Sequence, residues 1–393
     1  MKKKRIIHSG YQVIRWLLTA LVILFLTLSR QQPALALPIS DSSSPIPAAA
    51  MKLVRFGADP KAGLDIQAVA TLVDYVLGPK SAKETDLPKI QKATGAYYEF
   101  DTRINFASFL QYSYNSQIPS VLTSPSSLRY SLWTGSGEFQ KLPDSWKLVL
   151  PDDKPLVIRG LQRDGITPDL TTGVYYEYNL KKTFILLNHK GRQVLISISN
   201  QIDKSDVGKK GYILGNDDDW NYYYSSETGS ANTGLGWIKS YIYDYFSVGI
   251  HVESGSSPSI VRAGVFQWIR AGWSGINFVE TKHVIKGMKR NAKTSKTILE
   301  SPKLPTLNQI VSTYQRLSAL SQNDLAEKYT ALQQARQSLA ISSGQVETNK
   351  INKPESYANT PKEQIVEELM LEYFKSIFGK KSLLARKVVL GIN

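Results

Sequence analysis

The first regular pattern along the chain is helical. In the segment 65–77 apolar residues recur every three or four positions, a spacing that places side chains on one side of a helix. These residues are Ile66, Val69, Ala70, Val73, Val76 and Leu77. Gly78 and Pro79 follow directly and are typical of a helix end. We therefore expect one amphipathic helix here.

From about 93 to 298 the pattern changes to alternation, which predicts strands. Two apolar runs, 184–187 and 194–198, flank Gly191, which suits the tight turn of a hairpin. The segment 236–254 alternates most clearly and predicts one long strand. One side of it carries Ile238, Ile242, Phe246, Val248, Ile250 and Val252, and the other carries Trp237, Lys239, Tyr241, Tyr243, Tyr245 and His251. Short turns between such strands favour antiparallel pairing.

A long helix is predicted to close this region and to end before Pro302. Its apolar side carries Val284, Ile285, Met288, Ala292 and Ile298. Five lysines fall on one stripe of the same helix: Lys282, Lys286, Lys289, Lys293 and Lys296. The stripe has two interpretations, namely contact with an anionic lipid or phosphate-bearing surface or an ordinary solvated helix face. A solvated face is the more common role of such a stripe.

The rest of the chain is predicted to be helical, with one interruption. The segment 301–340 holds two apolar helical patterns with capping signals and predicts a helical hairpin. Residues 341–359 are polar and predict a linker. The segment 360–393 predicts a C-terminal helix, because Thr360 can cap it and Pro361 suits its first position.

The order of these elements resembles the helix-grip fold of START-type lipid-binding domains. A strand ("YYEFDTRI", 97–104) is followed by a helix ("NFASFLQYSYN", 105–115), then by antiparallel strands, and a long helix ("TKHVIKGMKRNAKTSKTIL", 281–299) closes the unit. In that fold a curved sheet wraps the last helix, and a small hydrophobic molecule lies between them. The predicted fold class is therefore α+β: a curved antiparallel sheet with a long closing helix over 51–300, plus a C-terminal α-helical extension.

The resemblance implies binding or transfer of an apolar or lipid-like ligand, without chemistry on it. One face of the sheet and the apolar side of the closing helix would line the cavity. Tyrosines suit an amphipathic ligand because each offers apolar area and a hydroxyl, although they could equally pack beneath the extra helices. The candidate ligand-binding residues are Tyr241, Tyr243, Tyr245, Trp220, Val284 and Met288.

The first residues have the layout of a secretory signal peptide, predicted over 1–36. A basic start precedes an apolar run at 17–28, and Ala34 and Ala36 offer small side chains to a signal peptidase. The run is shorter than the roughly 20 residues of a comfortable bilayer span; an uncleaved anchor is the alternative. Residues 37–50 are rich in Ser, Pro and Ala and predict a linker.

The composition and net charge of the chain limit the cellular compartment and the binding partners that we expect. The chain contains no cysteine, which excludes disulfides, thiol nucleophiles and thiolate metal sites. An exported chain of this size without disulfides is more typical of a Gram-negative periplasm than of a eukaryotic secretory pathway. The net charge is +15, and removal of the six basic residues in 1–36 leaves +9. This excess favours anionic surfaces only weakly, and nucleic acid is not an expected partner in the envelope.

Catalytic motifs are scarce. The histidines after position 36 are His189, His251 and His283, and none has the HExxH spacing of a metalloprotease. The stretch Gly272–Gly275 lacks the G-x-S-x-G spacing of a nucleophile elbow, and the sequence has no phosphate-binding loop or dinucleotide fingerprint. These absences favour a binding protein over an enzyme and imply no cofactor.

The stretch "GNDDDWNYYYSSETG", 215–229, has three interpretations. The residues that match the first ligand positions of a calcium loop are Asp217, Asp219 and Asn221. Tyr222, however, stands where that loop needs glycine. Trp220 and the tyrosines could instead stack on a sugar, or the carboxylates could act on one. An acidic turn before a tyrosine-rich strand needs no ligand, and we prefer this third interpretation.

Three functional hypotheses follow. The first is an exported, non-catalytic envelope protein that holds an apolar or lipid-like ligand, with an anionic membrane surface as a further partner. The second is an envelope scaffold whose C-terminal helices engage a protein partner. The third is a carbohydrate-binding or carbohydrate-acting protein that uses the stretch 215–224.

Overall fold

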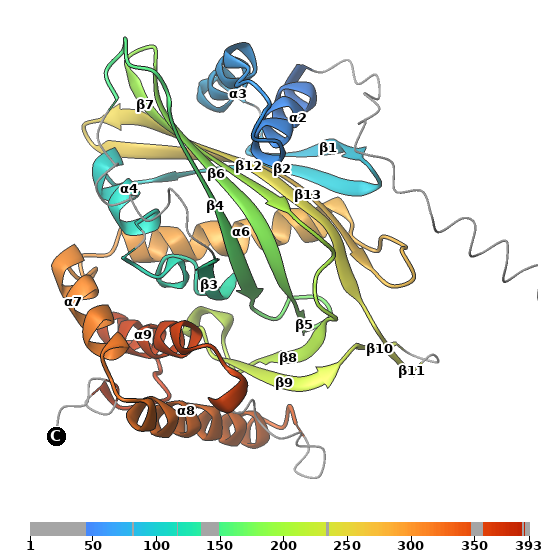
Figure 1. The fold of residues 1–393 in the computed structure, drawn as a ribbon, viewed down its shortest axis with the longest axis vertical. Coiled ribbons are helices and arrows are strands. Elements are labelled where there is room, and N and C mark those ends of the chain that lie inside the picture. Colours follow the sequence, from blue (N-terminus) through green and yellow to red (C-terminus); the bar gives the residue numbers. More distant parts are fainter. Residues whose placement is uncertain are drawn as a thin grey trace, which may run out of the picture. The chain divides into compact units, whose positions relative to one another are not determined.

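The computed structural model describes residues 45–80, 82–115, 117–134, 149–232, 236–346, 357–386 and 389. The chain divides into two compact units, Met1–Asp41 and Ser42–Asn393, and all described residues belong to the second. The predicted signal peptide and the first part of the predicted linker therefore lie outside the described residues. The second unit is α+β, with a curved sheet that does not close on itself (Figure 1).

Eight strands form the central sheet of the described residues, in the order β1-β2-β13-β12-β7-β6-β4-β3, and all neighbours are antiparallel. The predicted hairpin is confirmed as β6 and β7, joined by Lys190 and Gly191 with φ of 53° and 77°. Such two-residue turns need positive φ, which glycine adopts freely. The strand bounds are Glu84–Ile90 (β1), Ala93–Thr102 (β2), Leu128–Thr134 (β3), Leu156–Ile166 (β4), Glu177–His189 (β6), Arg192–Gln201 (β7), Tyr241–Ser256 (β12) and Ser259–Gly272 (β13).

Two helices, α2 (Pro45–Ala58) and α3 (Ile66–Leu77), cover one face of this sheet, which we call the outer face (Figure 1). Strand alternation sends β-branched side chains to that face. Ile185, Ile196 and Ile250 are register partners on three adjacent strands, and all three are fully buried. The outer face and the two helices thus form one apolar core.

The helix α3 confirms the first predicted helix. Asp65 caps it by accepting a hydrogen bond from Ala68 N at 2.8 Å. The linker prediction is wrong for residues 45–50, which form the start of α2. Burial explains the difference, because Ala49 and Ala50 are small enough to pack closely on the sheet and are at most 6 % exposed.

The opposite, inner face of the sheet carries α4 (Phe106–Ser113) and α6 (Thr281–Leu299) (Figure 1). Val284 and Met288 of α6 pack against Ala96 of β2. The long closing helix is therefore confirmed, and it lies along the sheet as expected.

The segment 236–254 is not one strand. A short strand, β11 (Gly236–Ile238), is separate from β12, and β12 carries a bulge between Ile242 and Asp244. A bulge inserts one residue and so reverses the alternation. Ile242 therefore packs in the same cluster as Tyr245, although alternation alone assigns them to opposite sides.

Two small sheets extend the fold beyond the central one. The stretch 215–229 contains the 3₁₀ turn Asp217–Asp219 and the whole strand Tyr222–Thr228, so an acidic turn does precede a tyrosine-rich strand. One sheet contains β5 (Val174–Tyr175), β8 (Lys209–Ile213) and β9 (Tyr222–Thr228), and the other pairs β10 (Ser230–Asn232) with β11.

The C-terminal extension packs into the same unit. The helices α7 (Leu307–Ser318) and α8 (Gln322–Ser342) confirm the two predicted in 301–340. The last predicted helix, 360–393, is confirmed only as α9 (Lys362–Phe378). Pro361 rather than Thr360 is its N-cap residue, no side chain caps it, and it ends at Gly379, which has a φ of 70°. Every residue of α9 from Gln364 to Lys375 is buried, and its apolar side chains join those of α7, α8 and β9 in one cluster. Among the described residues, no helix has the length and hydropathy needed to cross a bilayer.

Candidate binding cavity

A cavity of about 190 Å³ lies at the inner face of the sheet, against α4, α6 and the 3₁₀ turn η1 (Ser120–Leu122). Its aromatic wall consists of Phe100, Phe109, Trp133 and Phe184. An engineered cavity of about 150 Å³ is large enough to bind benzene. The volume here therefore suits a single ring with a few substituents.

Small side chains on the inner face leave room beside the sheet. Alongside Leu195 and His251, the inner face of β7 and β12 carries Ser197, Ser199, Ser247 and Gly249, of which Ser197 lines the cavity. The outer face of the same strands carries Ile196, Ile198, Val248 and Ile250. Ser197 stands opposite Phe184 of β6, and Ser199 stands opposite Lys182. Because alternate residues point to opposite faces, the same two strands supply a packed outer face and an inner face with room beside it.

The cavity wall carries a positive charge at Lys182, which is half-buried. Its Nζ donates a hydrogen bond to Ser199 Oγ at 2.7 Å. Burial lowers the pKa of Lys182, and the nearby Asp164 carboxyl partly opposes this shift. The ammonium group is therefore held among hydroxyl and aromatic neighbours in a place where its charge is costly.

Asp164 lies in the same wall and is 7 % exposed. Its Oδ1 accepts a hydrogen bond from Ser131 Oγ at 2.6 Å, and burial raises its pKa. Ser131 also donates its backbone N–H to Glu367 Oε2 of α9 at 2.9 Å. Burial raises the pKa of Glu367 well above its usual value. Hydrogen bonds thus connect the cavity wall to the C-terminal helix.

His251 of β12 contributes the most unusual group. Its Nε2 lies 2.8 Å from Tyr114 Oη, while its buried Nδ1 has no hydrogen-bond partner within the described ranges. The residue is 8 % exposed. Burial, followed by the positive charge of Lys182, lowers the pKa of His251 to about 3, so the imidazole is neutral near pH 7. A buried polar atom without a partner costs stability.

None of the six residues predicted to contact a ligand lines this cavity. Val284 and Met288 fill the core against Ala96. Trp220 is 2 % exposed, and its ring centroid lies 6.1 Å from that of Phe378. These three side chains therefore serve packing in the structure.

The three predicted tyrosines lie near the start of β12. The rings of Tyr241 and Tyr243 are 6.0 Å apart, and Tyr243 Oη accepts a hydrogen bond from Gly275 N at 2.9 Å. Tyr245 is half-buried, with its ring 5.8 Å from that of Tyr178. Contact of these six residues with a ligand stays a prediction. Lys182 lines the cavity instead, and the sequence pattern did not single it out.

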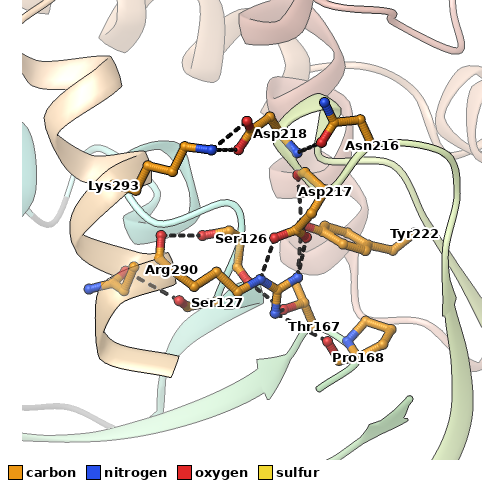
Figure 2. A network of polar contacts seen from close by, with 11 residues as sticks. Ser126, Ser127, Thr167, Pro168, Asn216, Asp217, Asp218, Tyr222, Arg290 and Lys293 are labelled. Atoms are coloured by element: carbon orange, nitrogen blue, oxygen red, sulfur yellow. Dashed lines mark hydrogen bonds and ion pairs between the residues drawn. The ribbon is translucent and has the colours of Figure 1, made fainter. Parts of the chain in front are cut away.

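The acidic stretch holds the closing helix in place (Figure 2). Asp217 Oδ2 accepts a hydrogen bond from Arg290 Nε of α6 at 2.7 Å, and its Oδ1 accepts one from Tyr222 Oη at 2.8 Å. Asp218 forms an ion pair with Lys293 of the same helix. The aspartates thus act as anchors for α6.

This placement bears on the other two interpretations of the stretch. Asp217 and Asn221, two of the three candidate calcium ligands, already contact cationic side chains, and Asn221 Oδ1 accepts from Lys375 Nζ at 2.8 Å. In the part of the chain that the structure describes, no three His, Cys, Asp or Glu residues are grouped so that they could hold a metal ion, Asp219 included. A sugar platform needs an exposed ring, whereas Trp220 is buried.

The lysine stripe of α6 is mostly paired within the chain. Four ion pairs form, between Lys282 and Glu280, Lys289 and Glu84, Lys293 and Asp218, and Lys296 and Glu300. Lys286 is exposed. Exposed ion pairs contribute little free energy, so these lysines could exchange partners. Contact of the stripe with an anionic surface stays a prediction.

The lining of the cavity combines aromatic rings, an ammonium group and the buried imidazole of His251. No protein-family model matches this chain, and no curated protein matches it significantly. Its function is therefore inferred from the geometry of the cavity.

Proposed function

We propose that the protein is a non-catalytic binding protein that holds one small amphipathic molecule between the sheet, α4 and α6. The observation that carries the proposal is His251, a buried polar residue that lines the cavity beside Lys182 and the aromatic rings. Core packing alone does not explain this group, because an apolar side chain would occupy the same position without the cost of desolvation.

The volume limits the size of the ligand. Pockets for drug-sized molecules measure about 300–1,000 Å³, whereas this cavity measures about 190 Å³. The apolar or lipid-like ligand expected from the sequence is therefore narrowed to a compact molecule, such as a ring or a short chain with one polar end.

The electrostatics of the cavity favour binding over catalysis. A general base works best when its pKa lies near the operating pH. The pKa of His251 is lowered to about 3, so its imidazole is a weak base at neutral pH. Export to a bacterial envelope belongs to the same proposal and is supported by the order of basic, apolar and small residues in 1–36.

The test is a fragment screen of the full chain by ligand-observed NMR, with compact molecules of about 6 to 10 non-hydrogen atoms, because a cavity only slightly smaller than this one holds benzene. Ser113 of α4 lines the cavity, and Ser113→Leu would fill part of it. Ser108 lies on the same helix outside the lining, so Ser108→Leu is the matched control. We expect hits that bind wild type and the Ser108 variant and lose at least about tenfold in affinity in the Ser113 variant.

Two results would overturn the proposal. One is a screen in which no fragment binds wild type. The other is a set of hits whose affinity is unaffected by Ser113→Leu, because such hits bind elsewhere on the protein.

A further inference from the structure

We infer that the cavity recognises a carboxylate, and that its ligand is a monocyclic aromatic acid of about the size of benzoate. This inference rests on the proposed function, since it names the chemical class of the molecule that the cavity would hold. It follows from the volume, the aromatic wall, the lysine and the histidine.

The shape of the wall favours a planar ring. Phe100, Phe109, Trp133 and Phe184 line the cavity, and the ring of Phe184 lies 6.0 Å from that of Trp133 at an interplanar angle of 69°. Aromatic rings pack on one another edge to face or offset, which adds to the free energy of burial. A volume of about 190 Å³ exceeds that of an engineered cavity of roughly 150 Å³ that binds benzene, which leaves room for one small substituent.

The charge of that substituent follows from Lys182. Its ammonium group can donate three hydrogen bonds, and Ser199 Oγ accepts one of them. Asp164 lines the same cavity, its Oδ1 accepts from Ser131 Oγ, and burial raises its pKa. A ligand carboxylate would accept the remaining hydrogen bonds of this half-buried ammonium group, and such charge-assisted bonds are the stronger kind.

Neutral hydrogen-bonding groups complete the polar side. His251 lines the wall through its buried imidazole, although Nδ1 itself is enclosed and has no partner among the described residues. Tyr114 adds a hydroxyl group at the same wall. Gln162 adds a buried amide at the same wall. A carboxylate can accept from several such donors at once, whereas an alcohol of the same size accepts fewer.

The experiment compares two probes of similar size by isothermal titration calorimetry on the full chain at pH 7. Benzoate carries the charge, and benzyl alcohol does not. We expect benzoate to bind wild type at least about tenfold more tightly, because hydrogen bonds to a charged group are the stronger kind. Lys182→Met should remove this preference while leaving the affinity for benzyl alcohol within about twofold. Lys181→Met, an exposed neighbour on β6, is the matched control and should change neither.

The possible outcomes distinguish a failure of the carboxylate inference from a failure of the proposed binding function. If benzyl alcohol binds wild type as tightly as benzoate, the charge specificity is wrong, although a small-molecule cavity remains. The charge specificity is also wrong if Lys182→Met still prefers benzoate over benzyl alcohol. It is wrong as well if neither probe binds, while other fragments bind wild type and lose affinity in the Ser113→Leu variant. If no fragment binds, both proposals fail. The wild-type comparison does not depend on the folding of any variant.

Discussion

Glu368 of α9 lies between two arginines from distant parts of the chain, Arg129 of β3 and Arg336 of α8. All three side chains are at most 4 % exposed, and the Arg129 guanidinium lies 4.0 Å from the centre of the Tyr224 ring. Burial by itself would raise the pKa of Glu368, but the two positive charges outweigh burial and lower it to about 2. The carboxylate is thus ionised and neutralises part of the charge in the core.

Replacement of Glu368 by Gln keeps the shape of the side chain and removes its charge. Two buried guanidinium groups would then lack a countercharge, and we expect the free energy of unfolding at pH 7 to fall by about 3–5 kcal/mol. Urea denaturation measures this change. Glu363→Gln, at an exposed position of the same helix, should change it by less than about 0.5 kcal/mol.

The pH dependence of this effect has a definite sign. The folded pKa of about 2 lies below the ordinary 4.5, so the contribution of Glu368 is fully present above pH 4.5 and is lost as the pH falls towards 2. The difference between wild type and Glu368→Gln should therefore shrink below pH 4.5. A difference that stays constant down to pH 3 would contradict the assignment.

Glycines decide how closely the helices approach the sheet. Gly264 of β13 lies beneath α3, where a Cβ would overlap Val76 Cγ2 and stand 2.9 Å from Tyr97 Oη. Gly287 lies on the exposed side of α6, where an added Cβ would have no other atom within 4 Å. Glycine thus permits close packing at position 264, whereas position 287 has room for a larger side chain.

The pair Gly264→Ala and Gly287→Ala tests this difference. At Gly264 the extra methyl forces α3 away from β13, and we expect a loss of about 1–3 kcal/mol. At Gly287 alanine has the higher helix propensity, and we expect a gain of about 0.5–1 kcal/mol. Thermal unfolding by circular dichroism gives both values. A stabilised Gly264 variant would mean that the helix does not pack as closely as described.

At the scale of the whole second unit, α9 is part of the core. Its apolar residues pack with those of α7, α8 and β9, and Glu367 reaches the cavity wall through Ser131. The scaffold hypothesis assigned the C-terminal helices to a protein partner. The buried segment Gln364–Lys375 offers such a partner little free surface on α9.

Removal of residues 357–393 is expected to abolish the cooperative thermal transition. Ile365, Val366, Leu369, Met370 and Phe374 are at most 1 % exposed, and each buried side chain of this kind contributes about 1.5–3 kcal/mol. Their sum is comparable to the 5–15 kcal/mol by which whole domains are stable. A chain shortened by only three residues is the control. If the long truncation melts like wild type, α9 is a detachable tail and the scaffold hypothesis regains support.

Local spacing made several elements predictable. The helix at 65–77 and the hairpin around Gly191 depend on contacts between residues a few positions apart, and both are confirmed. The curved antiparallel sheet with its closing helix is also confirmed. The bulge near Ile242 was missed, because the residues before and after it show the same alternation that an unbroken strand would show.

The candidate site could not be predicted in this way. Lys182 and His251 look like ordinary strand residues in the sequence, and the one local signal was the run of serines that alternate with Ile196 and Ile198. Trp220 attracted attention as an aromatic ring, yet it is buried. Whether a side chain is buried, paired or open to a cavity depends on what packs against it.

The sequence by itself determined the composition, the charge, the absence of cysteine, and the type and order of most elements, since these follow from residue identity and short-range periodicity. The tertiary structure alone decided where the cavity lies and which groups line it. Tyr114 and His251 are 137 residues apart along the chain, and Arg129 and Glu368 are 239 apart. Neighbours at such separations determine burial, pKa and hydrogen bonding, and they meet only when the chain folds.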